Sequence, residues 1–288
     1  MVDLRELVKS DEPALRAFLM RDPLYNLFMV GDLEVMGLGA DDLVYWGRFS
    51  SDGSLIAVAM RYRFWWCFYS EAGSSSFPFS RLVDGFSESQ GVNGHPDQVD
   101  PIIAHLERYT VREMHPSYYC RLPLEVITPS PVWTTRWATI DDAQALGELY
   151  ATAGHMQRDA DDVRRLILDE GRRLVVTEDG GRVVSAAATT IETSSAAMIG
   201  GVFTPASLRN RGYASAALTR LCSELIAEGI QPCLFYDNPA AGSIYRRLGF
   251  EDLGPWHLVF LQPRQTETDG FFLVTTWCSQ MACGIIPL

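Results

Sequence analysis

Residues 196–221, AAMIGGVFTPASLRNRGYASAALTRL, decide the fold of this chain. The apolar run at 196–204 predicts a buried strand, and the spacing of leucines over 212–229 predicts a helix with one apolar face. The connecting loop, TPASLRNRGYA (204–214), holds Arg209, Gly212 and Ala214 in the spacing R-x-x-G-x-A. The sequence therefore places a glycine-containing, arginine-rich loop at the start of a helix.

This loop has the properties of an anion site. The first backbone N–H groups of a helix lack partners and carry about half a positive charge between them. Gly212 and Ala214 keep large side chains away from an approaching phosphate, and Arg209 and Arg211 add positive charge. The alternative is a capped turn with two surface arginines, and the loop by itself does not separate the two interpretations.

A second motif follows, DNPAAGSIYRRLGF at 237–250. It comes directly after the apolar segment QPCLFYD (231–237), which we expect to be a strand. Asn238 lies at the end of that strand, where its amide can bond backbone or a ligand. Tyr245 lies one turn after Ala241 on the next predicted helix. A purely structural interpretation makes Tyr245 a core aromatic residue and Gly249 a helix C-cap, and both roles are compatible with binding.

Working outward, the second half alternates strands and helices. We predict strands at 135–138, 173–178, 182–192 and 251–261, and helices at 140–153, 159–171 and 239–249. The first half repeats this order, with helices at 11–22, 24–36 and 99–108, strands within 41–71 and at 111–122. The sequence predicts a mixed α/β sheet in each of two related domains, at 1–125 and 133–263, joined by a proline-rich linker at 126–132. The tail at 264–288 has no predicted role.

Composition excludes several classes of protein. The formal charge of −12 argues against nucleic-acid binding, which needs a basic surface. No apolar stretch is long enough to span a membrane, and the N-terminus has no secretory signal, so we expect a cytoplasmic protein that does not bind membranes. The six cysteines show no metal-ligand spacing, and we expect reduced thiols and no metal.

The two motifs, in this order and context, resemble the GNAT acetyltransferase superfamily over about 133–262. The resemblance implies a catalytic GNAT domain in the second half and acetyl-CoA as cosubstrate. It implies that the loop would hold the CoA pyrophosphate, that the strand before it would pair with the pantetheine arm, and that a splay from the strand 231–237 would admit the thioester. The implied cofactor-binding residues are Val202, Phe203, Thr204, Arg209, Asn210, Arg211, Gly212, Tyr213, Ala214, Asn238, Ala241 and Tyr245.

For catalysis, the resemblance implies direct attack of an amine on the acetyl carbon, with Tyr245 facing the thioester sulfur as the acid. A tyrosine has an ordinary pKa near 10 and can donate a proton at neutral pH. Many superfamily members carry a glutamate in the strand that here reads AAMIGGVF, and this strand has none. We take Glu192, just upstream, as the candidate base, with a solvated hairpin residue as the alternative. His155 is a second candidate.

The first domain resembles a GNAT half without the motifs, and we interpret it as a degenerate copy that shapes the acceptor pocket. We take its corresponding loop as 90–101, with Asp97 and Asp100 where phosphate would lie. The predicted function is an acetyl-CoA-dependent N-acetyltransferase, acting as a monomer or homodimer on an amine acceptor. Two alternatives stay open: a non-catalytic acyl-CoA sensor, and a tandem-domain aminoacyl or thiol-conjugate acyltransferase.

Overall fold

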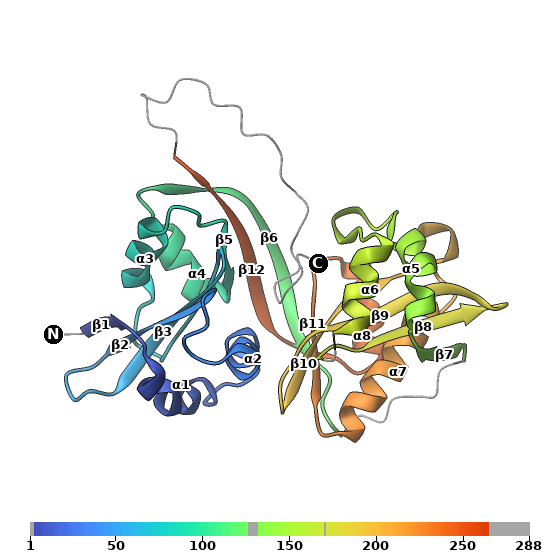
Figure 1. Ribbon diagram of the computed structural model, residues 1–288, viewed down its shortest axis with the longest axis horizontal. Helices are drawn as coiled ribbons and strands as arrows, with labels where there is room; N and C mark the ends of the chain where they lie inside the picture. Colours follow the sequence, from blue (N-terminus) through green and yellow to red (C-terminus); the bar gives the residue numbers. More distant parts are fainter. Residues whose placement is uncertain (1–2, 126–131, 170, 265–288) are drawn as a thin grey trace. The chain divides into compact units, whose positions relative to one another are not determined.

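The computed structural model describes residues 3–125, 132–169 and 171–264 (Figure 1). Almost all of the expected linker and the whole tail after Arg264 lie outside the described residues, as does the side chain of His155. The described chain forms two compact units: residues 3–117 with 254–264, and residues 118–253. We call them unit 1 and unit 2.

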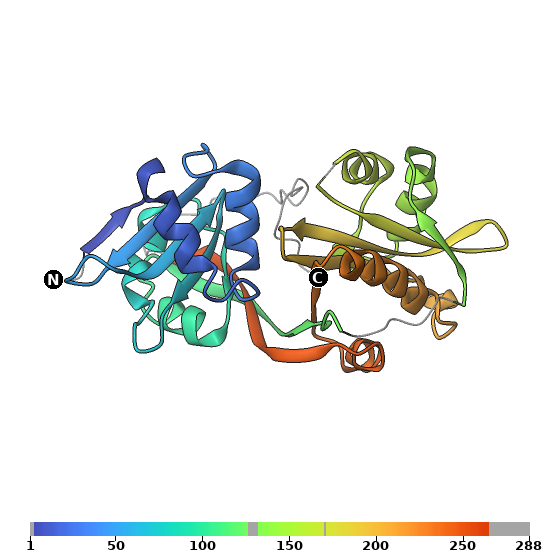
Figure 2. The same ribbon diagram turned by 90° about the horizontal axis from the view of Figure 1, so that it is seen from below.

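Unit 1 is a sheet with helices on both faces (Figure 2). Its helices are α1 (Glu12–Leu19), α2 (Leu27–Met36), α3 (Ser80–Gly85) and α4 (Pro96–Ile103). Its strands run in the order β1 (Asp3–Glu6), β2 (Leu43–Phe49), β3 (Leu55–Tyr62), β4 (Trp65–Ser70), β5 (Gly91–Gly94), β12 (Glu251–Pro263) and β6 (Tyr109–Arg121). β4 and β5 are parallel neighbours. The predicted strand region 41–71 therefore holds three strands.

Unit 2 repeats this pattern. Its helices are α5 (Ala143–Tyr150), α6 (Ala160–Leu168), α7 (Tyr213–Ala227) and α8 (Pro239–Arg247). From the edge inward, its strands are β7 (Thr134–Trp137), β8 (Leu174–Asp179), β9 (Arg182–Glu192), β10 (Ala196–Phe203) and β11 (Gln231–Tyr236), followed by the end of β6. β10 and β11 are parallel. Figure 2 shows α5 and α6 on one face of this sheet and α7 and α8 on the other.

The two long strands β6 and β12 each pass from one unit into the other. Both are 13 residues long, and at about 3.3 Å per residue such a strand is long enough to pair with strands of both units. The last residues of β6 pair with β11, from Tyr118 opposite Tyr236 to Arg121 opposite Cys233. The later part of β12 pairs with β5 in unit 1. Each unit is thus completed by a strand that follows a helix of the other half.

This exchange differs from the expected division of the chain. We placed the strand at 251–261 in the second domain. Instead His257 lies opposite Gly94 and Phe260 opposite Gly91, both on β5. Sequence periodicity identifies a strand but carries no information on which of two similar sheets it joins.

The loop that we expected at 90–101 in the first domain is not the counterpart of the anion loop. Residues 91–103 form β5 and α4, the counterparts of β11 and α8, so 90–101 does not correspond to the anion loop. The counterpart of 204–214 is 71–79, EAGSSSFPF, which follows β4 and contains no arginine or lysine. Sequence analysis missed the four-residue strand β5, and this shifted the expected alignment.

In unit 1 the end of the parallel pair is closely filled. The last paired residues of β4 and β5 are Cys67 and Asn93. The indole N–H of Trp256 donates to Asn93 Oδ1 at 2.8 Å, and the ring of Tyr25 lies 5.4 Å from that of Trp256. A cavity of only about 10 Å³ remains between these side chains. Large aromatic residues thus occupy the place that a ligand arm would need.

We predict that Gly91→Ala destabilises the protein. A methyl group at Gly91 would lie 2.6 Å from the carbonyl oxygen of Val259 and overlap the Trp65 ring, so β5 and β12 would have to separate. Overpacking of this kind costs about 1–3 kcal/mol. Chemical denaturation measures the loss. Gly85→Ala is the control, because a methyl group there meets no atom within 4 Å; an equal loss in both variants would contradict the close approach.

Candidate functional site

The central feature of unit 2 is a gap between two parallel strands. β10 and β11 pair from Ala196 opposite Gln231 as far as Ile199 opposite Leu234, the last pair that the described residues show. The register between β10 and β9 also shifts between Gly200 and Phe203, which marks a bulge. Beyond Ile199, β10 therefore runs on without β11 beside it, as the predicted splay required. Its backbone groups on that side can pair with an extended ligand.

Glycine is needed at both positions of the bulge. Gly201 has φ of +60°, which disfavours residues with a Cβ. A Cβ at Gly200 would lie 2.6 Å from Thr190 Cγ2. The carbonyl of Gly201 accepts a hydrogen bond of 2.5 Å from the hydroxyl of Tyr150, a buried residue of α5. The bulge is thus held from the α5 side by one tyrosine.

The loop after β10 has a left-handed backbone at two places. Asn210 has φ of +63° and Gly212 has φ of +86°; asparagine and glycine are the residues that tolerate this conformation best. Gly212 is the N-cap of α7, and no side chain caps the helix there. The first N–H groups of α7, including that of Ala214, have no intrahelical acceptor. The loop therefore presents uncapped donors beside exposed Arg209 and Arg211.

Several contacts hold this loop in shape. The Nε of Arg209 donates to the carbonyl of Thr204 at 3.1 Å. Thr204 Oγ1 lies 2.8 Å from Ser185 Oγ, which donates to the carbonyl of Phe203 at 2.9 Å. Trp133, the residue before β7, donates from its indole nitrogen to the carbonyl of Arg211 at 2.8 Å. These hydrogen bonds within the protein therefore fix the conformation of the loop.

Tyr213, an expected cofactor residue, has a buried side chain with structural contacts. Its hydroxyl donates to Asp179, its ring packs 4.6 Å from that of Trp133, and its carbonyl accepts from Thr177 Oγ1 at 3.0 Å. Only its backbone N–H remains for an anion. Val202 is half-buried and packs against the core on the α7 side.

The second motif starts α8. Asn238 is the N-cap of this helix, and its side-chain oxygen accepts from the N–H of Ala240 at 2.9 Å. Asn238 is exposed, and its NH₂ group can still donate. Ala241, on the first turn, is half-buried. Gly242, beside it, has no room for a Cβ, which would lie 2.5 Å from the ring of Tyr236.

Tyr245 lies where α8 meets the core. Its ring packs at 5.8 Å from Tyr236 and 5.9 Å from Phe250. Burial raises the pKa of this phenol well above its ordinary value of 10. Its hydroxyl has no hydrogen-bond partner among the residues that the structure describes, although every other feature of the residue is that of a core aromatic. A protonated, unpartnered hydroxyl of this kind can donate to a ligand.

Glu192 is engaged elsewhere. Its Oε2 accepts from Arg173 Nε at 3.1 Å, and its Oε1 accepts from Thr189 Oγ1 at 2.5 Å. It lies opposite Ala197, in the paired part of β10 before the bulge. Arg173 also holds Glu228 through two hydrogen bonds of 2.6 Å. The structure therefore does not bring Glu192 together with Tyr245, and it gives its carboxylate a structural partner.

The cysteines of unit 2 belong to the core. Cys120, Cys222 and Cys233 are all buried. Burial raises the pKa of the Cys233 thiol to about 12, so it stays protonated at neutral pH. In the described parts of the chain no group of three His, Cys, Asp or Glu side chains could hold a metal ion. No described helix is long and apolar enough to cross a membrane.

Two residues beside the bulge were missed. Tyr150, on the helix predicted at 140–153, was not singled out from the sequence. Arg158, between α5 and α6, was not singled out at all; its guanidinium carbon lies 5.5 Å above the Tyr150 ring. No sequence pattern identifies either, because their proximity to Gly201 is produced by packing of α5 on the sheet.

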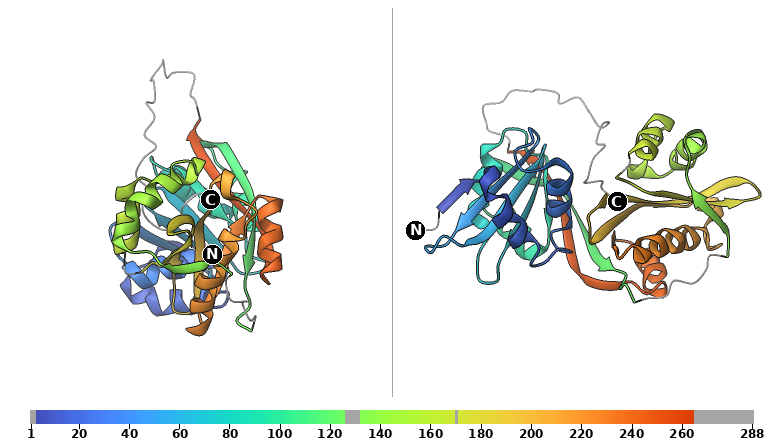
Figure 3. Two further views of the ribbon diagram at one scale, coloured as in Figure 1. Left: turned by 90° about the vertical axis from the view of Figure 1, so that its right-hand side faces the viewer. Right: turned by 60° about the horizontal axis from the view of Figure 1, so that its bottom comes forward.

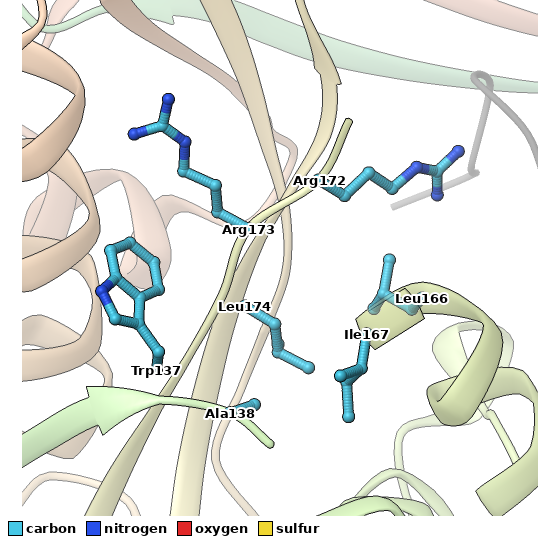
Figure 4. Close-up of a pocket in the computed structure, with 7 residues that line it drawn as sticks. All are labelled: Trp137, Ala138, Leu166, Ile167, Arg172, Arg173 and Leu174. Carbon is cyan, nitrogen blue, oxygen red and sulfur yellow. The ribbon is translucent and has the colours of Figure 1, made fainter. Parts of the chain in front are cut away.

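A hollow of about 340 Å³ lies apart from the expected cofactor residues (Figure 4). Arg172, Arg173, Trp137 and side chains of α6 line it. Figure 4 shows the two arginines pointing away from each other, and each is paired with a carboxylate, Arg172 with Asp169 and Arg173 with Glu228. It therefore lacks a free charge for a ligand, and the gap beside β10 is the stronger candidate.

Comparisons with known proteins identify the family of unit 2 and the fold of the chain. Residues 139–250 match the family model described as the acetyltransferase (GNAT) family. A search of curated proteins finds no match. Among solved structures, a GCN5-related N-acetyltransferase from Sphaerobacter thermophilus is 16% identical, with a TM-score of 0.60, and the match covers 91% of this chain and 95% of that one.

Two further structures show the same likeness. A GNAT-family acetyltransferase from Colwellia psychrerythraea is 14% identical, with a TM-score of 0.54, covering 90% of this chain and 100% of that chain. A tandem GNAT protein from the clavulanic acid biosynthesis pathway is 14% identical, with a TM-score of 0.56, covering 91% and 98%. The predicted family and mixed α/β fold are confirmed: this chain carries a domain of the GNAT acetyltransferase family at residues 139–250, within a fold that GNAT structures share over most of its length.

Proposed function

We propose that unit 2 transfers an acetyl group from acetyl-CoA to an amine acceptor. The observation that carries the proposal is the position of Tyr245, whose hydroxyl has no partner in the described chain, on the helix that follows the gap between β10 and β11. Proton donation to a leaving thiolate requires such a group. The uncapped start of α7 supplies the complementary anion site.

The residues present fit the cosubstrate. The N–H groups at the start of α7, with Arg209 and Arg211, would bind the pyrophosphate. The unpaired side of β10 at Gly201 and Val202 would bond the amides of the pantetheine arm, as a sheet edge binds an extended peptide. Asn238 would donate to the same arm from its NH₂ group. Acetyl-CoA supplies the activated acyl group when bound.

The reaction needs no covalent enzyme intermediate. The amine nitrogen would form a bond to the acetyl carbon while the carbon–sulfur bond breaks, and the departing sulfur would take the Tyr245 proton. The extra proton on the product nitrogen would pass to water, since an acceptor arriving as the neutral amine needs no protein base. The Tyr245 phenolate would take a proton back from water, which restores the acid. This route is compatible with Glu192 being held by Arg173.

The engagement of Glu192 also favours a second candidate, a non-catalytic acyl-CoA sensor. With both of its oxygens hydrogen-bonded, this carboxylate is poorly placed to accept a proton. Release of free CoA thiol across a panel of amines separates the two candidates. Saturable binding of acetyl-CoA without amine-dependent thiol release would support the sensor and contradict transfer.

We predict that Tyr245→Phe lowers kcat about 100-fold, the typical contribution of a positioned general acid. The affinity for CoA, measured by calorimetry, should stay within about twofold, because the ring contacts with Tyr236 and Phe250 are retained. Tyr236→Phe is the control: this hydroxyl already donates to Asp252 at 2.7 Å. An unchanged kcat in Tyr245→Phe would remove its assigned role.

We predict that Gly212→Ala weakens CoA binding about 10-fold, roughly 1.4 kcal/mol. The substitution strains a left-handed position and turns the first N–H groups of α7 away from the anion. Gly229→Ala is a matched control at the other end of α7, where φ is +77° and a methyl group meets nothing within 4 Å. Both variants should lose similar stability, and equal losses of CoA affinity would contradict the anion site.

The raised pKa of Tyr245 predicts a pH profile. Because the acid must be protonated, a pKa above its ordinary value of 10 keeps it active through neutral and mildly alkaline pH. The value of kcat/KM should therefore rise with pH as the acceptor amine loses its proton and then stay level up to about pH 9.5. A descending limb between pH 7 and 9 that is absent in Tyr245→Phe would contradict this.

A further inference from the structure

Arg158 lies beside the bulge on the face opposite to Tyr245. One of its terminal nitrogens, Nη1, is 3.8 Å from the place where a Cβ on Gly201 would be. Its guanidinium also lies over the ring of Tyr150, whose hydroxyl holds the carbonyl of Gly201. The positive charge of Arg158, in the loop between α5 and α6, thus lies beside Gly201 in the bulge.

The charge of Arg158 is not neutralised within the described chain, where no carboxylate lies within 4.0 Å of it. The acidic residues that follow it are engaged with other groups. Asp159 caps α6, accepting from the N–H groups of Asp161 and Asp162 at 2.9 and 2.8 Å. Asp161 and Asp162 pair with the arginines on their own helix. Arg158 is half-buried, so its guanidinium can be reached by a ligand.

The two faces of the sheet divide the reaction between them. Tyr245 packs with the core on the α7 side, and Tyr150 packs with the core of α5 and α6 on the other. Figure 3 (right) shows these helix pairs on opposite sides of the strands of unit 2. An amine attacks the acetyl carbon from one face of the planar thioester. Tyr245 lies on the α7 side, so Arg158 beside Gly201 is the charged group on the α5 and α6 side that an acceptor at the gap would meet.

We propose that Arg158 binds a carboxylate of the acceptor, so that the substrate is an amine with a carboxylate a few bonds away, as in an amino acid. This inference rests on the proposed acetyl transfer. The guanidinium fork matches a carboxylate with two parallel hydrogen bonds. The short reach from Gly201 to Arg158 places the carboxylate close to the reacting nitrogen. A single arginine suits one negative charge, whereas phosphate sites usually add further donors.

The test compares amino acids with their own C-terminal amides, which differ only in the negative charge. Binding of L-alanine, L-glutamate and L-phenylalanine and of their amides to the CoA-loaded protein is measured by ligand-observed NMR, and thiol release from acetyl-CoA is measured with the same set. At least one acid should bind about 10- to 100-fold more tightly than its amide, the range for a hydrogen bond to a charged group.

Arg158→Met should bring the ratio of acid to amide close to one. Arg158→Lys keeps the positive charge but loses the two parallel N–H donors of the guanidinium, so it should give an intermediate ratio. This variant tests the carboxylate site even if Arg158→Met does not fold. Arg164→Met is the matched control, because it removes a cation from the same region that is paired with Asp161. It should leave the ratio as in the unsubstituted protein.

The outcomes distinguish this inference from the proposed function. A ratio near one in the unsubstituted protein, or one that is the same in Arg158→Met, overturns the carboxylate site. Thiol release with acids and amides alike does so too, while it upholds acetyl transfer. A preference for acids that depends on Arg158 but comes with no thiol release upholds the anion site and overturns the transferase.

Discussion

The arrangement of unit 2 depends on where the parallel pairing of β10 and β11 stops. Two neighbouring glycines bulge β10 after Ile199, and the hydroxyl of Tyr150 holds the bulge at 2.5 Å from the Gly201 carbonyl. From that point the backbone of β10 has no strand beside it. Uncapped N–H groups lie at one end of this free edge, at Gly212, and the unpartnered hydroxyl of Tyr245 belongs to the helix that follows β11. The proposed site is therefore a consequence of a local interruption of a sheet.

The same interruption exists in unit 1 and is filled. β4 and β5 stop pairing at Cys67 and Asn93, but Trp256 bonds Asn93 and packs against Tyr25. Trp256 arrives on β12, a strand that follows a helix of unit 2. Because β12 joins unit 1, Trp256 fills the place where β4 and β5 stop pairing. Unit 2 receives the end of β6 instead, and β10 and β11 stay unpaired beyond Ile199 and Leu234. Two related halves can thus come to differ in their ligand gap because different strands join them, while the strands around the gap are kept.

The two faces of unit 2 carry different chemistry. On the α7 and α8 side, burial raises the pKa of the half-buried Tyr245 phenol, so it stays protonated at neutral pH and can donate a hydrogen bond. On the α5 and α6 side, Arg158 offers a charge that the described chain does not neutralise. The parallel pairing of β10 and β11 ends between these two faces, after Ile199 and Leu234. The protein as a whole has a formal charge of −12, so a cation beside the gap contrasts with its overall charge.

By itself the sequence determined the class of fold, the repeat and the two motifs around Gly212 and Tyr245, because apolar periodicity and glycine placement depend on local backbone geometry. Tertiary structure alone decided which sheet the strand at Glu251–Pro263 joins, since strands of two similar sheets have the same periodicity. It also decided that Glu192 is held by Arg173, and that Arg158 lies at Gly201. Contacts between side chains far apart in the chain depend on how helices pack on the sheet, and no spacing in the sequence encodes them.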